Sequence, residues 1–548
     1  MSGTGPLRSF WGWGNEGAGL GAEERRTLEQ MLRARLGAIE CRPLTPPRLE
    51  DVRLPAPRFS PSGPLAALFT QDPRERAGHT YGKAYRDIIR GIEGDFAAAP
   101  DAVALPSSEA ELAQVLSLCD ERGLAAIPYG GGSSASGGVE ARLGGRFRGA
   151  ISIDLRRLDR VLEVDSVSRS ARIEAGIYGP ALEEALRPRG LTLRHYPQSF
   201  EFSTLGGWLA TRSGGHFATL HTHIDDFVAS MRVITPSGIF ASRRLPGSGA
   251  GPAPERLFLG SEGALGIITE AWMRLQDRPR FRASVTVRFG DFLCAAGVAR
   301  RLAQSGLHPQ NCRVLDAAEA LNNGAGDGSE HLLLVAFESA DHPLDAWMSR
   351  ALEICREEGG VFREGAGKTR EDGEGEREGA AGTWRRMFLQ GPYLRDAITT
   401  LGLIAETFET AVTWDRFPAF HAAVLGATER AAREVCGAAV VTCRLTHVYP
   451  DGVAPYFTVI GAGKAGSLVQ QWDEIKIAAS EAIIAHGGTI THHHAVGRDH
   501  QPWYEQERSP LFGQALGAVK RALDPRGIMN PGVLLALDDA GRLPPTGD

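Results

Sequence analysis

The sequence lacks the marks of a secreted or membrane-spanning protein. Its seven cysteines are scattered without a C-x-x-C pair, and an odd, dispersed set does not form a disulfide framework. No run of about 18 apolar residues occurs, and residues 1–20 show no charged region followed by an apolar one, as a signal peptide would. We therefore expect a cytoplasmic protein without a transmembrane span, at most peripheral at a membrane surface.

The chain also lacks an excess of basic charge. Its 60 Lys and Arg residues are outnumbered by 66 Asp and Glu, for a formal net charge of −6. This composition gives no broad basic field, so a nucleic-acid partner is not expected. With 548 residues, 43% of them hydrophobic, the chain can bury the cores of two or more domains.

Glycine, in contrast, is abundant. The chain has 67 glycines in 548 residues, about 12% against a usual ~7%. The densest cluster, residues 127–138 (IPYGGGSSASGG), directly follows a predicted strand. Without Cβ atoms, the backbone N–H groups can converge on phosphate oxygens, and the serines add donors. The segment therefore predicts a pyrophosphate site; a flexible glycine linker is the alternative interpretation.

Hydrophobic periodicity predicts helices and strands in an α+β arrangement. Helices are expected at 23–39, 109–122, 292–305 and 347–358, and strands at 125–128, 150–155, 161–164, 170–174 and 331–337. Residues 364–382, rich in Gly, Glu and Arg, predict a surface loop. The change of pattern near residue 280 indicates a domain boundary. We expect an N-terminal extension (1–80), a first domain (81–280), a second domain (281–500) and a C-terminal segment (501–548) that returns to the first.

Two further Gly/Ser segments follow the first cluster: 197–215 (PQSFEFSTLGGWLATRSGG) and 260–270 (GSEGALGIITE). In this order the three segments resemble the FAD-binding domain of the vanillyl-alcohol-oxidase/p-cresol-methylhydroxylase flavoprotein family. The resemblance implies a PCMH-type FAD-binding domain of two subdomains, followed by an α/β cap with an antiparallel sheet. It also implies that the first segment holds the FAD pyrophosphate, while the other two line the isoalloxazine and adenosine.

The resemblance assigns FAD contacts to residues in all three segments. They are Pro128, Tyr129, Gly130, Gly131, Gly132, Ser133, Ser134, Gln198, Ser199, Ser203, Thr204, Gly207, Thr211, Arg212, Ser213, Gly214, Glu262, Gly263, Leu265, Gly266, Ile267 and Ile268. Residues 130–138 include no His or Cys that could attach the ring, so we expect FAD to be bound non-covalently.

Segments in the second domain narrow the resemblance to the alkyldihydroxyacetonephosphate synthases, a family of ether-lipid-forming flavoenzymes. They are 408–416 (FETAVTWDR), 441–444 (VTCR), 455–457 (PYF) and 488–497 (GTITHHHAVG). Matched residue by residue, Tyr456 would act as acid/base on the exchanged oxygen and Arg444 would bind the substrate phosphate. His492, His493 and His494 would supply a base, with His195 and Arg313 in support.

These residue types suit that chemistry. A planar guanidinium matches a phosphate dianion. Removal of a proton alpha to a ketone needs a base such as an imidazole that is neutral near pH 7. The resemblance implies that acyl-dihydroxyacetone phosphate (acyl-DHAP) exchanges its fatty acid for a long-chain alcohol through a flavin N5 adduct, without net redox change. The expected partners are these small lipid substrates, and a homodimer is compatible with the sequence.

Plainer interpretations exist for several of these residues. A tyrosine in an apolar strand, such as Tyr456, is more often packed in a core, and Arg444 could be a surface strand residue. An extended His492–His494 segment would put its first and third rings on one face and the second on the other. No Cys, Asp or Glu lies at ligand spacing, so no metal site is predicted.

Two alternatives concern function. Residues 461–466 (GAGKAG) match G-x-G-x-x-G, but a simple strand-to-helix turn is favoured over a nucleotide site. The fold also hosts FAD-dependent oxidoreductases acting on a 2-hydroxy acid, of the D-lactate or glycolate type, or on an alcohol. The chain departs from the synthase pattern at His221 and His223, where an aromatic and a small polar residue are expected. These departures bear on the substrate more than on the cofactor.

Overall fold

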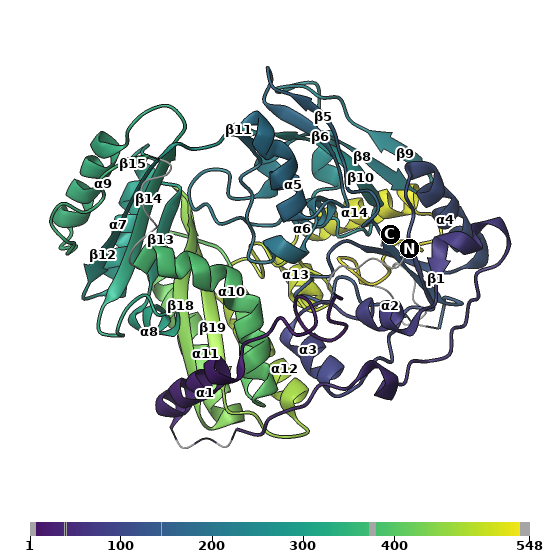
Figure 1. The fold of residues 1–548 in the computed structure, drawn as a ribbon, viewed down its shortest axis with the longest axis horizontal. Helices are drawn as coiled ribbons and strands as arrows, with labels where there is room; N and C mark the ends of the chain where they lie inside the picture. The colour runs from purple at the N-terminus through teal and green to yellow at the C-terminus, as the bar shows by residue number, and fades with distance from the viewer. Residues whose placement is uncertain (1–6, 38, 40, 144, 372–379, 537–548) are drawn as a thin grey trace.

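A computed structural model describes residues 7–37, 39, 41–143, 145–371 and 380–536, with the backbone alone for 380–387. The chain forms two units that lie side by side, the first on the right of Figure 1 and the second on the left. None of the described helices is long and apolar enough to cross a membrane.

The first unit contains most of the short strands. Its elements are η2 (Gly63–Leu68), β1 (Phe69–Thr70), α2 (Pro73–Gly78), α3 (Tyr85–Ile92), β2 (Ala102–Ala104), α4 (Glu109–Arg122), β3 (Ala125–Tyr129), β4 (Ala150–Asp154), β5 (Val161–Asp165), β6 (Ser170–Glu174), α5 (Gly179–Leu186), η3 (Arg187–Arg189), β7 (Leu191–Thr192), η4 (Phe200–Phe202), α6 (Leu205–Thr211), η5 (Ile224–Phe227), β8 (Val228–Thr235), β9 (Gly238–Ala241), η6 (Pro254–Leu257), β10 (Ile267–Arg274) and β11 (Gln276–Asp277). A mixed sheet has the order β1-β2-β4-β3, with β2 and β3 parallel to β4. An antiparallel sheet has the order β5-β6-β10-β8-β9.

The second unit is built on one large antiparallel sheet. Its elements are β12 (Phe281–Phe289), α7 (Phe292–Gln304), β13 (Asn311–Leu315), α8 (Ala317–Asn322), β14 (His331–Ser339), α9 (Asp345–Glu357), β15 (Arg370–Glu371), α10 (Ala380–Thr400), β16 (Ile404–Glu409), β17 (Val412–Thr413), α11 (Phe417–Cys436), β18 (Ala439–Val448), β19 (Gly452–Gly461) and α12 (Leu468–Ala485). The strand order is β15-β12-β14-β13-β18-β19-β16, with β17 paired to β19.

Period-two alternation gives this sheet two different faces. In β14, Leu333 and Val335 belong to the large core that also contains residues of α7, α9, α11 and α12. Leu332 and Leu334 belong to a separate small cluster with Phe388 of α10. The face toward α10 therefore carries a much smaller hydrophobic cluster, and other side chains of this face line a cavity.

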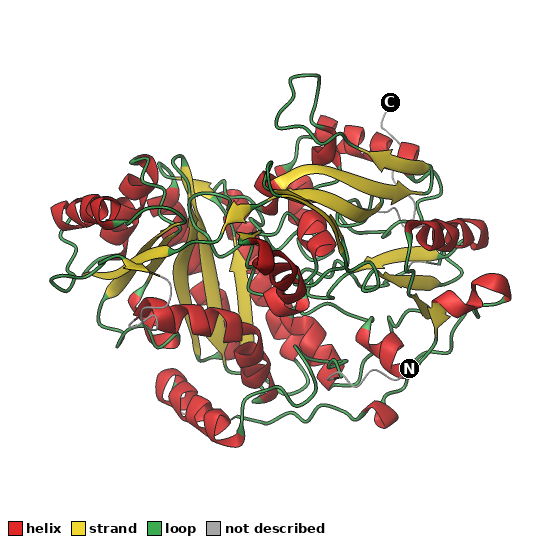
Figure 2. Ribbon diagram, turned by 45° about the horizontal axis from the view of Figure 1, so that its top comes forward, coloured by secondary structure: helices red, strands yellow, loops and turns green. Residues whose placement is uncertain are grey.

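The first long helix and the C-terminal segment pack against different units, while Phe10, before that helix, packs on the first unit. In α1 (Ala22–Leu36), Leu28 and Leu32 join the core of the second unit. Beyond η1 (Leu49–Asp51) the chain enters the first unit. At the other end, α13 (Gln501–Glu507) and α14 (Pro510–Leu523) lie on the first unit, and Ile528 and Met529 are part of its core. Figure 2 shows α1 below the large sheet, remote from the first unit's strands.

The sequence predictions agree closely with these elements. The helix at 109–122 is confirmed: Ser108 accepts a hydrogen bond from the N–H of Glu111 at its start, and Gly123 adopts φ 65° at its end. The helix expected at 23–39 ends at Leu36, before Gly37 with φ 81°. The loop predicted for 364–382 is confirmed over residues 364–369, but residues 370–371 form β15, which pairs with β12, and α10 begins at Ala380. Residues 372–379 lie outside the described residues.

Candidate active site

A cavity of about 300 Å³ lies between the two units. The first unit contributes the glycine cluster and the segment around residues 197–215, and the second contributes the sheet face toward α10. Helices α1 and α10 add apolar side chains to the wall: Leu28, Met31, Leu32, Leu394 and Ile398. The cavity therefore joins segments that are more than 400 residues apart in the chain, such as Leu28 and Tyr456.

The glycine cluster is tightly packed against the second Gly/Ser segment. A Cβ atom on Gly130 would overlap the Thr204 hydroxyl, and one on Gly131 would overlap the Phe202 carbonyl. Gly132 has φ +68°, and a Cβ there would overlap the Tyr129 hydroxyl. Only glycine fits at these positions, so the flexible-linker interpretation is wrong and the segment is a fixed backbone cradle.

Thirteen of the residues predicted to bind FAD line this cavity. They are Gly130, Gly131, Gly132, Ser133, Ser134, Gln198, Ser199, Ser203, Thr204, Gly207, Thr211, Ser213 and Gly214.

The other nine predicted FAD residues are not part of the cavity wall. Leu265, Ile267 and Ile268 are packed in the core of the first unit. Glu262 accepts hydrogen bonds from the backbone N–H groups of Val496 and Gly497, and burial raises its pKa to about 7. The remaining five, Pro128, Tyr129, Arg212, Gly263 and Gly266, also lie off the cavity wall. Their FAD contacts stay predictions.

Alternation along three strands brings Arg313, Arg444 and Tyr456 to the cavity face of the sheet. Their neighbours Cys312, Cys443 and Phe457 point into the core on the opposite side. Arg444 and Tyr456 are directly paired on β18 and β19, and the guanidinium carbon lies 3.8 Å from the centroid of the tyrosine ring. Arg444 is buried, so its interpretation as a surface residue is wrong. Tyr456 is buried as well, and its side chain lines the cavity wall.

Both arginines are buried and constrained. Arg444 is ion-paired with Glu319 at 2.5 Å. Arg313 donates to the carbonyl of His216 at 2.9 Å and lies 5.0 Å from the centroid of the Phe388 ring. Burial, with the nearby charge of Arg444, lowers the pKa of Arg313 to about 9, and it also raises the pKa of the Tyr456 hydroxyl.

The histidine triplet wraps around one buried carboxylate. Glu409 accepts backbone N–H bonds from His492, His493 and His494 at 2.6, 3.1 and 2.8 Å, and the Thr491 hydroxyl donates to it at 2.6 Å. The segment is therefore a turn and not an extended strand. Contrary to the alternation prediction, His493 and His494 both line the cavity while His492 does not.

The triplet rings are neutral in this environment. Burial lowers the pKa of His493 to about 3 and that of His494 to about 4, although Glu409 opposes the shift. The Thr491 hydroxyl and the three backbone N–H groups that donate to Glu409 favour its charged form, and the pKa of this carboxyl lies well below its usual range. Glu409 thus lies beside neutral imidazoles, and an imidazole that accepts a proton forms an ion pair with it.

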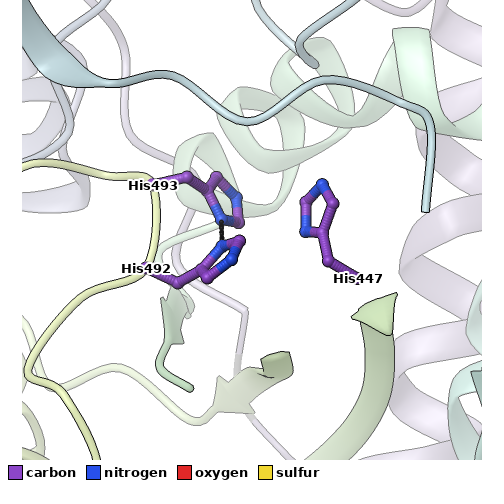
Figure 3. A group of neighbouring side chains, drawn as sticks. All are labelled: His447, His492 and His493. Atoms are coloured by element: carbon purple, nitrogen blue, oxygen red, sulfur yellow. Dashed lines mark hydrogen bonds between the residues drawn. The ribbon is translucent and has the colours of Figure 1, made fainter. Parts of the chain in front are cut away.

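His447, at the end of β18, completes a histidine cluster with His492 and His493. Figure 3 shows the three rings turned toward one another. One nitrogen of each ring lies within 4.8 Å of the others, as do one ligand atom each of Glu409, His493 and His494. The second group includes Glu409, a carboxylate that is distant from the triplet in the sequence but adjacent to it in space.

His195 lies beside the cavity and not in it. Its Nε2 is 3.4 Å from the Ser213 hydroxyl, which does line the cavity. Its ring packs against Trp208, and burial lowers its pKa to about 3. The structure thus brings His195 close to the site through Ser213.

Comparisons with known proteins decide the family. The family model described as "FAD binding domain" matches residues 100–241, and "FAD linked oxidases, C-terminal domain" matches residues 278–534. The chain is 30% identical over 521 residues to the alkyldihydroxyacetonephosphate synthase of Dictyostelium discoideum, covering 89% of this chain and 83% of the relative. It is 31% identical over 477 residues to that of Trypanosoma brucei brucei, covering 85% and 78%. The chain belongs to the alkyldihydroxyacetonephosphate synthase family.

A solved alkyldihydroxyacetonephosphate synthase structure supports the assignment. It matches with a TM-score of 0.77 at 25% identity, over 95% of this chain and 98% of that one. The predicted family, α+β fold class and FAD cofactor are confirmed, and the chain is an FAD-dependent enzyme of this synthase family. The cavity fits FAD, because the cradle excludes any Cβ and Lys83, a buried cation whose pKa burial lowers to about 8, lines the wall beside it.

Sequence reasoning missed several members of this synthase-family site. Glu409 lies in the quoted segment 408–416, but nothing in its local pattern pairs it with residues 492–494. Glu319 belongs to no motif that the sequence analysis identified. Alternation from Arg444 predicts Thr446, and not His447, on the cavity face of the strand. A β-bulge between Leu445 and His447 is what turns this ring to the cavity.

Proposed function

We propose that the protein exchanges the acyl group of acyl-DHAP for a long-chain alkoxy group, as the resemblance implies. The observation that carries the proposal is the joint presence, on one cavity, of two buried guanidinium groups, a buried tyrosine and neutral imidazoles beside the glycine cradle. An oxidoreductase of small hydroxy acids needs no apolar wall. Here α1 and α10 contribute Leu28, Met31, Leu32, Leu394 and Ile398, which suit an alkyl chain.

In this proposal each side chain has one task. Arg444 and Arg313 bind the phosphate dianion of the substrate, since buried guanidinium groups recognise phosphate strongly. His493 or His494 removes the proton alpha to the ketone. Tyr456 protonates the departing carboxylate oxygen and then takes the proton of the entering alcohol. FAD, when bound, supplies an electron-accepting ring next to the reacting carbon.

Glu409 and Glu319 act as positioning residues. Glu409 fixes the turn of the triplet through three backbone N–H groups and stabilises the positive charge that a proton creates on it. Glu319 holds Arg444 over the Tyr456 ring through the ion pair. Both carboxylates therefore act on groups that touch the substrate.

We also propose that the chain divides into an N-terminal extension (1–80), an FAD-binding domain (81–280), a cap domain (281–500) and a C-terminal segment (501–548). A peripheral contact with a membrane surface follows from the partitioning of the proposed substrates into lipid. Assembly as a homodimer stays a prediction.

The proposal is tested with purified FAD-loaded protein, acyl-DHAP carrying a label in its acyl chain, and hexadecanol. We expect labelled fatty acid and alkyl-DHAP in equal amounts, with the oxidised flavin absorption band intact afterwards and no electron acceptor consumed. Persistent bleaching of that band by D-lactate or glycolate, together with no product from acyl-DHAP, would instead establish the oxidoreductase alternative.

A further inference from the structure

Three histidine rings link the cavity to the protein surface. His493 lines the cavity, and its Nδ1 lies 3.0 Å from the Nδ1 of His492. The other nitrogen of His492, Nε2, lies 3.1 Å from the Nε2 of His223. His223 belongs to the first unit and is partly exposed, so the row crosses the interface between the units.

The hydrogen bonds assign the proton on each ring. The carbonyl oxygen of Arg212 can only accept, so His223 donates to it from Nδ1 at 2.9 Å and its Nε2 is an acceptor. His492 then donates from Nε2, which leaves its Nδ1 to accept the Nδ1–H of His493. Each neutral ring therefore donates in the same direction, from the cavity toward the surface, and His493 keeps Nε2 as its acceptor.

We propose that His493, His492 and His223 form a proton relay that carries the proton removed from the substrate to solvent. The inference rests on the proposed function, which requires that a carbon-bound proton leave the cavity. It makes His223, a departure from the synthase pattern in the sequence, a functional residue of the other unit.

The transfer is balanced at every ring. The substrate proton binds Nε2 of His493, whose Nδ1–H proton moves to Nδ1 of His492. The Nε2–H proton of His492 then moves to Nε2 of His223. The His223 imidazolium loses its Nδ1–H proton to water at the exposed Arg212 contact. Each ring gains one proton at one nitrogen and loses one at the other, and reversal of the same steps resets the row.

The surroundings favour a relay over storage of the charge. His492 and His493 are buried, and desolvation lowers the pKa of both, so neither ring retains the proton. Tyr449 offers a side branch, because its hydroxyl lies 2.6 Å from Nε2 of His492 and 3.1 Å from the Thr222 hydroxyl. Thr222 is buried, so this branch does not reach solvent.

A metal ion bound to these rings would also bring them together, so the experiment must distinguish a metal site from a proton relay. The metal-free hydrogen bonds already satisfy the facing nitrogens of these rings, so the geometry needs no ion. A structural or catalytic metal would instead appear as about one equivalent of zinc or a similar ion in the purified protein.

The test compares His223→Asn with His221→Asn. His221 is exposed, belongs to the same segment and packs on Phe227 instead of His492. In deuterium oxide, wild-type protein and His221→Asn are expected to incorporate solvent deuterium at the exchanging carbon of acyl-DHAP. His223→Asn should slow both this incorporation and turnover by about tenfold to a hundredfold, since acid–base groups typically contribute at least that much. Bound FAD and the melting temperature should match those of His221→Asn.

A second variant separates proton transfer from packing. Added imidazole should restore part of the lost rate in His223→Ala and leave His221→Ala unchanged, which a merely structural role would not predict. Equal deuterium incorporation and turnover in His223→Asn and His221→Asn would overturn the relay while leaving the exchange activity intact. A metal equivalent that disappears in His223→Asn would also overturn it. No alkyl-DHAP from wild-type protein would show that the proposed function itself has failed.

Discussion

Arg444 and Tyr456 form one recognition unit: they are paired across β18 and β19, and the guanidinium carbon lies 3.8 Å from the centroid of the phenol ring. A cation held this close stabilises the phenolate form of the tyrosine. Burial opposes that effect and raises the pKa of the hydroxyl overall. The tyrosine therefore rests as a proton donor beside a phosphate-binding group.

Replacement of either partner should impair exchange without unfolding the protein. We expect Tyr456→Phe to lose at least about a hundredfold in turnover. Arg444→Lys should raise KM for acyl-DHAP, because lysine cannot give the bidentate contact. FAD content and melting temperature are measured alongside. The matched controls are Tyr504→Phe and Arg430→Lys, which lie outside the cavity wall; unchanged turnover in Tyr456→Phe would return this residue to a packing role.

The glycine cradle predicts a cofactor defect in Gly131→Ala. Its Cβ would overlap the Phe202 carbonyl, and the forced shift should weaken FAD binding by about 1–3 kcal/mol, or roughly fivefold to a hundredfold. Titration of the apoprotein with FAD, followed by flavin fluorescence, measures the change. Gly145→Ala is the control because nothing lies within 4 Å of its Cβ; equal affinities in the two variants would contradict the cradle.

We expect FAD to be released by acid. No His or Cys lies within residues 130–138, so trichloroacetic acid should move all yellow colour into the supernatant, where absorbance quantifies it. Colour that remains in the pellet after washing would reveal a covalent bond and contradict the non-covalent prediction.

Glu409→Gln should weaken the hydrogen bonds that fix the turn of residues 492–494 and lower the turnover. An amide has one acceptor oxygen for the three backbone N–H groups that the carboxylate now binds, and it cannot stabilise an imidazolium. We expect turnover to fall by at least about a hundredfold, with some loss of thermal stability. Glu507→Gln changes a carboxylate that binds the same segment at Ile490 and should have a much smaller effect; comparable losses in both variants would argue for a general loosening.

The turnover of bound substrate should stay constant on mild acidification. An ordinary imidazole, with a pKa near 6.5, would lose about tenfold in rate per pH unit below that value. Burial lowers the pKa of His493 to about 3 and that of His494 to about 4, so both remain neutral bases from pH 7 to pH 5. We expect kcat at saturating acyl-DHAP to be nearly flat over this range, provided that FAD stays bound. An inflection near pH 6.5 would show that the base is a different, solvated group.

The sequence predicted the parts of the site that local patterns encode. Alternation in short apolar strands allowed Arg444 and Tyr456 to be placed in strands, and the glycine cluster indicated a backbone cradle because only glycine permits such close approach. The family resemblance supplied the roles. The turn of His492–His494 escaped prediction because it depends on Glu409, which is 83 residues from His492 along the chain and shares no local pattern with it.

The contacts between units were the least predictable. His223 and His492, whose rings are in contact, are 269 residues apart along the chain. The apolar wall includes Leu28, which belongs to a helix that the sequence analysis placed in an N-terminal extension. Such contacts depend on how two folded units dock, and hydrophobic periodicity within a segment carries no information about its partner.

The division of the cavity wall between two units has a consequence for how this architecture can change. The cradle that fits the cofactor comes from one unit. Arg313, Arg444 and Tyr456 project from alternate positions of the sheet in the other, and His493 and His494 project from a turn. Replacing a few outward-facing strand residues could redirect the chemistry while leaving both hydrophobic cores and the cofactor cradle untouched. Flavoproteins with this architecture can thus keep the cofactor site unchanged while the functional groups that face it are replaced.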